Sequence, residues 1–116
     1  MVDTLKKTKQ FRTVYNTAQS IADSNLVIYR IENGTDQNRF GISASKKVGC
    51  AVVRNKIRRQ IKEILRLNNA AFRNGYDIIF VVRVRCGKAD YNAIRNSVYH
   101  LARKSNLLIN SSARFV

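Results

Sequence analysis

Residues 37–62 constrain this chain more than any other segment, because they carry eight cations and no Asp or Glu. The cations are Arg39, Lys46, Lys47, Arg54, Lys56, Arg58, Arg59 and Lys62. Repulsion among closely spaced cations opposes a compact state unless a polyanion binds them. Apolar residues are interleaved with these cations, which indicates a folded basic face rather than a disordered tail. A nucleic acid backbone is the polyanion that best matches such a face.

The composition of the whole chain agrees with this interpretation. The 116 residues suffice for one domain with a single core, and 45% of them are hydrophobic. Lys and Arg number 22 against 7 Asp and Glu, so the formal net charge is +15. A disordered basic tail would lack the apolar residues needed to build a core. We therefore expect one folded domain over residues 1–116.

The cysteines and the N-terminal segment point to a cytoplasmic protein. Cys50 and Cys86 belong to no C-x-x-C pattern and have no neighbouring histidines, so we expect reduced thiols and no zinc site. Residues 1–10 mix charges with Thr and contain no apolar signal segment. No stretch is long and apolar enough to cross a bilayer. The protein is expected to be soluble and cytoplasmic, without a membrane partner.

The first half of the chain predicts one helix and two strands. Phe11, Val14, Tyr15 and Ala18 recur at helical spacing after Thr8, which is a suitable N-cap. Residues 26–31 form a β-branched and aromatic run, and residues 39–45 alternate between apolar and polar. Asn33-Gly34 marks a turn between these two runs. We expect the two strands to pair antiparallel, with one face on the core.

From residue 51 the apolar residues change to the period of a helix. Val53, Ile57, Ile61, Ile64 and Leu65 fall within one arc of about 120°. Arg54, Arg58, Lys62 and Arg66 form a column spaced by four residues on the remaining surface. Like charges at this spacing cost an isolated helix a few tenths of a kcal/mol per pair, roughly. The cost suggests that a partner outside the helix compensates it.

The last third of the chain predicts a central strand and a final helix. After Gly75, residues 76–84 read as a buried strand. Asp90 is placed to cap a helix whose inner stripe is Tyr91, Ile94, Val98 and Leu101. The order of helix, strands, helix, strand and helix predicts an α+β fold, with helices packed on a mixed sheet.

The chain offers little support for catalysis by the protein itself. Its seven acidic residues are spread singly, without the paired carboxylates that hold catalytic metals in nucleases. His100 is the only histidine, and no Gly-rich phosphate loop is present. We therefore assign no catalytic and no metal-binding residue.

Within the basic block the motifs are specific enough to indicate a family. They are Ser43-Ala-Ser-Lys-Lys47, Gly49-Cys-Ala-Val52 and Arg54-Asn-Lys-Ile-Arg-Arg-Gln-Ile-Lys62. The chain resembles the protein subunit of bacterial ribonuclease P, with further matches at Leu5-Lys6-Lys7, Phe11, Leu26-Val27-Ile28-Tyr29, Asp77-Ile78-Ile79 and His100-Leu101. Cys50 stands where the family has Asn, Lys56 and Lys62 where it has Arg, and Arg58 where it has Lys. Lys56 lacks the bidentate fork of Arg, which loosens phosphate geometry there.

This resemblance implies both a fold and a function. The implied fold is similar to the second domain of ribosomal protein S5, with a four-stranded sheet, three helices and a left-handed crossover into the basic helix. The implied function is removal of the 5′ leader from precursor tRNA by a ribonucleoprotein whose catalytic centre belongs to a large RNA that uses Mg²⁺. The chain would be a single RNA-binding domain that binds the ribonuclease P RNA and precursor tRNA, and no DNA partner is expected.

The resemblance also assigns roles to individual residues. It implies that the catalytic RNA is bound by Arg54, Asn55, Lys56, Arg58, Arg59 and Lys62, together with Lys46 and Lys47. It implies that the single-stranded leader is bound in a central cleft by Phe11, Tyr15 and Tyr29, to which we add Arg39, Ser43 and Ser45 from the polar face of their strand. Aromatic rings stack on bases with little sequence preference, which suits leaders of varied sequence. Spacing alone favours a core position for Phe11 instead.

Two other functions remain open at this stage. Small basic α+β domains are common among ribosomal proteins and assembly factors, and only the Arg-Asn-Lys-x-Arg-Arg pattern argues against them. An autonomous metal-dependent nuclease would need clustered carboxylates and would have to act without an RNA partner.

Overall fold

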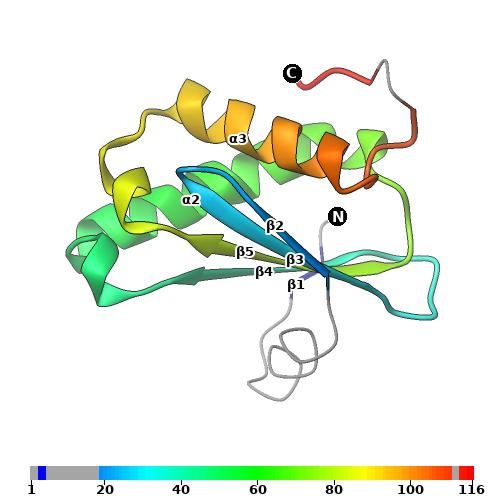
Figure 1. Ribbon diagram of the computed structural model, residues 1–116, viewed down its shortest axis with the longest axis horizontal. Helices are drawn as coiled ribbons and strands as arrows, with labels where there is room; N and C mark the ends of the chain where they lie inside the picture. Colours follow the sequence, from blue (N-terminus) through cyan, green and yellow to red (C-terminus); the bar gives the residue numbers. More distant parts are fainter. Residues whose placement is uncertain (1–2, 5–18, 111–112) are drawn as a thin grey trace.

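The computed structural model describes residues 3–4, 19–110 and 113–116, and it places a mixed β-sheet against two long helices (Figure 1). The strands are β1 (Asp3–Thr4), β2 (Gln19–Ala22), β3 (Leu26–Glu32), β4 (Arg39–Ala44) and β5 (Tyr76–Val82). The helices are α2 (Ala51–Asn68) and α3 (Tyr91–Lys104), with short 3₁₀ turns η1 (Lys46–Val48), η2 (Asn69–Ala71) and η3 (Val84–Lys88). The mixed α+β architecture is confirmed.

The sheet has the strand order β1-β4-β5-β3-β2. β3 runs antiparallel to both of its neighbours, β2 and β5, whereas β4 runs parallel to β5 and to the two-residue β1. A parallel pair requires a crossover connection, and α2 supplies it between β4 and β5. β1 therefore adds a short edge strand to the four longer ones.

The expected antiparallel pairing of residues 26–31 with 39–45 is wrong, because β5 lies between β3 and β4. Ile78, Ile79, Phe80 and Val82 of β5 are all buried, so this strand is covered on both faces. A strand that is apolar on both faces is most stable in the centre of a sheet, where both of its edges are also paired. β5 also ends at Val82, two residues before the predicted end, since η3 begins at Val84.

α2 and α3 lie side by side over one face of the sheet, and the core fills the space between the two layers (Figure 1). α2 contributes Ile57, Ile61, Ile64 and Leu65, which confirms the predicted apolar stripe, with Val53 half-buried at its start. α3 contributes Ile94, Val98 and Leu101, with Tyr91 half-buried. The sheet contributes Phe40, Ile28, Phe80 and their neighbours on the same face.

The predicted start of the last helix is also confirmed. Asp90 precedes α3, and its Oδ1 accepts a hydrogen bond of 2.8 Å from the backbone N–H of Ala93. The helix expected around Phe11 to Ala18 lies outside the described residues, so the structure describes two long helices where the resemblance implied three.

Gly75 makes the turn before β5 possible. Its φ of 95° is in the left-handed region, and a Cβ there would meet the backbone oxygen of Thr35 at 2.8 Å. Its carbonyl accepts a 2.9 Å hydrogen bond from the backbone N–H of Asn33. The segment between β3 and β4 is thereby tied to the start of β5.

Candidate RNA-binding surfaces

The outward surface of α2 holds six of the predicted RNA-binding residues, and we call this surface the α2 basic face. Its members are Arg54, Asn55, Lys56, Arg58, Arg59 and Lys62. Asn55, Lys56, Arg59 and Lys62 are exposed, whereas Arg54 and Arg58 are half-buried at the margin of the helix. The apolar stripe holds α2 on the sheet, so its polar residues are presented to the surroundings without a cost in packing.

The six residues wrap around the exposed side of α2. Lys56 and Arg58 are two positions apart, so they lie about 160° apart around the helix axis. Asn55, Arg59 and Lys62 lie between them. The six residues therefore form a wide polar face of α2 rather than a single column.

Arg54 and Arg58 also form hydrogen bonds within the protein. The Nε of Arg54 donates to the Gly49 carbonyl oxygen at 3.2 Å, and the Nη2 of Arg58 donates to the Ala44 carbonyl oxygen at 3.4 Å. The Nη1 of Arg58 donates to Oδ1 of Asn55 at 3.3 Å. These bonds direct Arg54 toward the residues just before α2 and Arg58 toward the end of β4, while both side chains stay half-exposed.

Charge along α2 is compensated only near its C-terminal end. Glu63, the single acid in the helix, binds Arg66 through Oε1 to Nη2 at 2.6 Å and Oε2 to Nε at 3.1 Å. The hydrogen bond from Arg66 lowers the pKa of the Glu63 carboxyl. Cations in the first turn also oppose the helix dipole, by about 0.3–1 kcal/mol each. The uncompensated charge is therefore concentrated on the first three turns, where the predicted RNA-binding residues lie.

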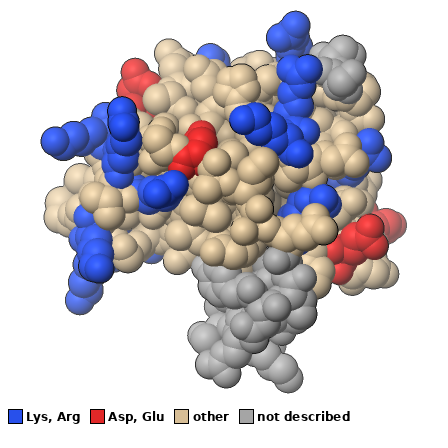
Figure 2. Space-filling model, viewed as in Figure 1, with Lys and Arg blue, Asp and Glu red and all other residues tan. Residues whose placement is uncertain are grey.

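η1 places two more cations beside the start of α2. Lys46 and Lys47 are exposed, while Val48 is buried and anchors the turn. Figure 2 shows Lys and Arg side chains at the end of the molecule where η1, η3 and the start of α2 lie, with acidic side chains beside some of them, and further Lys and Arg side chains over the other half of this face. Lys46 and Lys47 thus lie beside the α2 basic face, and their role in binding RNA stays a prediction.

The second face of the sheet, turned away from α2 and α3, brings three of the predicted leader-binding residues together. Tyr29 on β3 is paired with Ile79 on β5, and Ile79 with Gly41 on β4, so these three residues form one row across the sheet. Arg39 and Ser43 lie in the neighbouring rows of the same face. Ile79 is fully buried here, packed by Tyr29, Ile31 and Val81. The ring of Tyr29 therefore rests on an apolar floor.

Arg39 forms an ion pair with Asp77 on this face. Its Nε donates to Oδ1 of Asp77 at 2.8 Å and its Nη2 to Oδ2 at 2.6 Å. The Asp77 side chain is 9% exposed and the Arg39 side chain 38%. Asp77 also accepts a 3.0 Å hydrogen bond from Nδ2 of Asn33. Arg39 thus supports the fold, and only its accessible part is available to a ligand.

The remaining predicted leader-binding residues are not brought to this row. Ser45 follows β4 and is the exposed N-cap of η1, next to Lys46. Phe11 and Tyr15 lie outside the described residues. Of the predicted aromatic set, the structure places only Tyr29.

The thiols and the histidine differ in their surroundings. Cys50 is exposed at the N-cap of α2, where backbone hydrogen bonds from Val53 and Val52 lower its pKa. Cys86 is buried, which raises the pKa of its thiol to about 11. His100 is exposed, with its ring against Tyr99 at a centroid distance of 5.5 Å.

Neither a metal cluster nor a membrane span was found in the described residues. No three His, Cys, Asp or Glu side chains come together there as ligands for a metal ion. Within the same part of the chain, no helix is long and apolar enough to cross a bilayer.

Sequence reasoning missed an ion pair of the site and the strand β2 of the sheet. The pairing of Arg39 with Asp77 joins residues 38 positions apart, and no local pattern indicates it. β2 is short and mostly exposed, so it lacks the alternation that marks a strand. The alternation of residues 39–45 did correctly place Arg39 and Ser43 on the face opposite Phe40.

Comparison with known proteins gives consistent matches along the chain. Residues 2–106 match the family model described as Ribonuclease P. The chain is 45% identical over 107 residues to the ribonuclease P protein component of Alkaliphilus oremlandii, covering 92% of this chain and 94% of that one. It is 44% identical over 106 residues to that of Clostridioides difficile, covering 90% and 93%. The solved structure of the Staphylococcus aureus RNase P protein superposes with a TM-score of 0.86 at 33% identity, covering 90% of this chain and 96% of that one.

These matches decide between the functions that composition left open, since they extend well beyond the basic motif into both halves of the fold. The chain belongs to the family of bacterial ribonuclease P protein components, the protein subunit of the ribonucleoprotein that processes the 5′ end of precursor tRNA and carries its catalytic centre in RNA.

Proposed function

We propose that this protein divides its RNA contacts between two surfaces, with the catalytic RNA on the α2 basic face and the leader of precursor tRNA on the second face of the sheet. The observation that carries the first half is the uncompensated charge on the first three turns of α2. Phosphates that bind Arg59 and Lys62 release counterions and remove the repulsion that these residues create in the free protein. Lys46 and Lys47 add contacts at the edge of the same surface.

The second half of the proposal rests on the row formed by Tyr29, Ile79 and Gly41. Gly41 and Ile79 are buried in this row, so the half-buried ring of Tyr29 is the part on which the face of a base could rest. Stacking on an aromatic ring contributes about 1–3 kcal/mol per base and tolerates any base. Ser43 and the accessible part of Arg39 would contact the backbone of the strand, and Phe11 and Tyr15 would complete the cleft, with Ser45 at its margin.

In this proposal the protein supplies binding and the RNA supplies the chemistry. Mg²⁺ would neutralise phosphate charge during hydrolysis. Since the described part of the chain has no three-ligand cluster, we assign Mg²⁺ to the RNA subunit and the substrate and derive no step of the protein through it. The complex would work in the cytoplasm.

The proposal also includes three features of the fold: a first helix near residues 11–18, a left-handed β4-α2-β5 crossover and a likeness to ribosomal protein S5.

The test is cleavage of precursor tRNA by a bacterial ribonuclease P RNA over a series of Mg²⁺ concentrations. We expect the wild-type protein to permit cleavage at Mg²⁺ concentrations at which the RNA alone is inactive, because its cations replace part of the screening by metal. The double variant Arg59→Ala/Lys62→Ala should lose much of this gain. The control Arg103→Ala/Lys104→Ala removes two exposed cations from the far end of α3 and should keep it. A Mg²⁺ dependence that the wild-type protein leaves unchanged would refute the proposal.

A further inference from the structure

A groove of about 850 Å³ lies beside η3, apart from the second face of the sheet. It is bordered by the turn between β2 and β3, by η1, by the first turns of α2 and by the start of α3. Its volume falls within the roughly 300–1,000 Å³ that is typical of ligand sites, which combine apolar walls with a few polar groups. Neither RNA-binding surface described above accounts for it.

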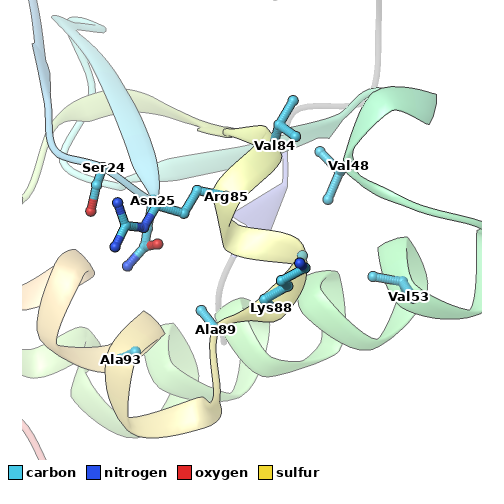
Figure 3. A pocket seen from close by; sticks show the side chains of 10 residues that line it. Ser24, Asn25, Val48, Val53, Val84, Arg85, Lys88, Ala89 and Ala93 are labelled. Carbon is cyan, nitrogen blue, oxygen red and sulfur yellow. The ribbon is translucent and has the colours of Figure 1, made fainter.

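The walls of this η3 groove have two kinds of character (Figure 3). On one side of η3, Val48 and Val53 extend toward Lys88. On the other side, Arg85 extends toward Ser24 and Asn25. The groove thus has an apolar wall beside Lys88 and a polar wall beside Arg85, on opposite sides of η3.

The close packing of η3 against η1 fixes the backbone that borders the η3 groove. Gly87 brings the backbone of η3 so close to η1 that a Cβ there would lie 2.5 Å from the Val48 carbonyl oxygen. Val48 is buried, so η1 cannot move away without disturbing the core. The backbones of η1 and η3, which carry Val48 and Lys88, are therefore held close together.

The charges of the η3 groove have no counterpart among the residues that line it. Arg85 and Lys88 are exposed, and neither forms an ion pair with any described residue. The two acids that adjoin lining residues in the sequence, Asp23 and Asp90, already accept hydrogen bonds from backbone N–H groups: Asp23 from Asn25 and Leu26 at 2.8 Å, and Asp90 from Ala93. Val84, at the mouth, is 60% exposed. An anionic ligand with an apolar face would satisfy both the cations and the valines.

We propose that the η3 groove binds a single-stranded segment of the ribonuclease P RNA, with a base against Val48 and Val53 and backbone phosphates at Lys88 and Arg85. Single strands bind where cations track the backbone and apolar surfaces receive splayed bases. The groove also meets the α2 basic face, because Val53 precedes Arg54 and Val48 follows Lys47. One strand can therefore pass from one surface to the other. This inference rests on the proposed function.

The first test compares two double variants in equilibrium binding to the RNA over a series of salt concentrations. Arg85→Ala/Lys88→Ala should weaken binding several-fold and reduce the salt slope by roughly 0.7 for each phosphate that the protein no longer neutralises. Arg103→Ala/Lys104→Ala removes the same charge far from the groove and should leave the slope unchanged. Equal changes in the two variants would mean that only net charge matters, and the inference would be wrong.

The second test addresses the groove itself. Val84→Glu places a carboxylate at the mouth, and Ile109→Glu places one at another exposed apolar position, 52% accessible, outside the groove. Only Val84→Glu should weaken RNA binding markedly. Chemical probing of the RNA should then show a few single-stranded nucleotides that the wild type protects and that Arg85→Ala/Lys88→Ala exposes. An identical protection pattern in both proteins would overturn the inference.

The outcomes also separate this inference from the proposed function. If the wild-type protein fails to bind the RNA, the proposed function itself fails. If Arg59→Ala/Lys62→Ala weakens binding while the η3 groove variants match their controls in affinity, slope and protection, only the groove inference fails.

Discussion

Arg39 on β4 and Asp77 on β5 occupy paired positions of two parallel strands, and their side chains meet in two hydrogen bonds of 2.8 and 2.6 Å. This pair ties the start of β4 to the start of β5, the strand that the α2 crossover enters. The ion pair thus reinforces the parallel pairing of β4 with β5 on the second face of the sheet.

Asp77→Asn should lower the free energy of unfolding by about 1–3 kcal/mol, because Arg39 then loses the charge that its two hydrogen bonds require. Urea denaturation measures this change. Asp36→Asn is a matched control, since Asp36 is exposed in the neighbouring loop, and it should have little effect. In combination with Arg39→Ala, the Asp77→Asn loss should shrink. Fully additive losses in the double variant would show that the ion pair does not stabilise the protein.

The buried thiol of Cys86 predicts a loss of stability in alkali. Burial raises the pKa of this thiol to about 11, whereas the pKa of a thiol in the unfolded chain is about 8.5. As the pH rises through this interval, the unfolded state releases its proton first, so the free energy of unfolding falls. Between pH 8 and pH 10 the loss should be about 1–2 kcal/mol.

Urea denaturation at the two pH values measures the Cys86 contribution. Cys86→Ala should lack this part of the loss, although it leaves a small cavity at both pH values. Cys50→Ser removes the exposed thiol and should keep the loss. If Cys86→Ala and the wild type lose equal stability between pH 8 and pH 10, the thiol is not the cause.

The net charge of +15 predicts that sulfate stabilises the free protein. An anion that binds only the native basic sites raises the melting temperature by mass action. Thermal melts in sulfate and in chloride, at equal ionic strength, should show a higher melting temperature in sulfate. The gain should be smaller in Arg59→Ala/Lys62→Ala. A melting temperature that does not respond to sulfate would contradict the prediction.

Local patterns predicted α2 and α3 well, whereas the order of the strands depends on distant residues. The apolar stripe of α2 and the Asp90 cap of α3 depend on residues within one or two turns, so sequence alone indicates them. The insertion of β5 between β3 and β4 depends on pairing across more than 30 residues, and the Asn33-Gly34 turn suggested the wrong neighbour. For the same reason the sequence placed Arg39 on the correct face but did not reveal its bond to Asp77.

The proposed leader-binding role of Tyr29 predicts that its removal lowers the affinity for precursor tRNA alone. Tyr29→Ala should weaken binding of precursor tRNA by up to about 1–3 kcal/mol, the contribution of one stacked base, and should leave mature tRNA unaffected. Tyr29→Phe keeps the ring and should retain most of the affinity. Since Tyr29 packs on buried Ile79, each variant must first be shown to be folded by its melting curve. An equal loss for precursor and mature tRNA would mean that the ring is structural.

The most direct test of the account is whether its two surfaces fail independently in one reconstituted holoenzyme. The measurement is a pair of constants for each variant: the affinity of the protein for the RNA subunit, and the ratio of holoenzyme affinities for precursor and mature tRNA. Arg59→Ala/Lys62→Ala should lower the first and leave the second unchanged, whereas Tyr29→Ala should do the reverse. If both variants lower both constants by similar factors, the protein does not divide its contacts between the α2 basic face and the second face of the sheet.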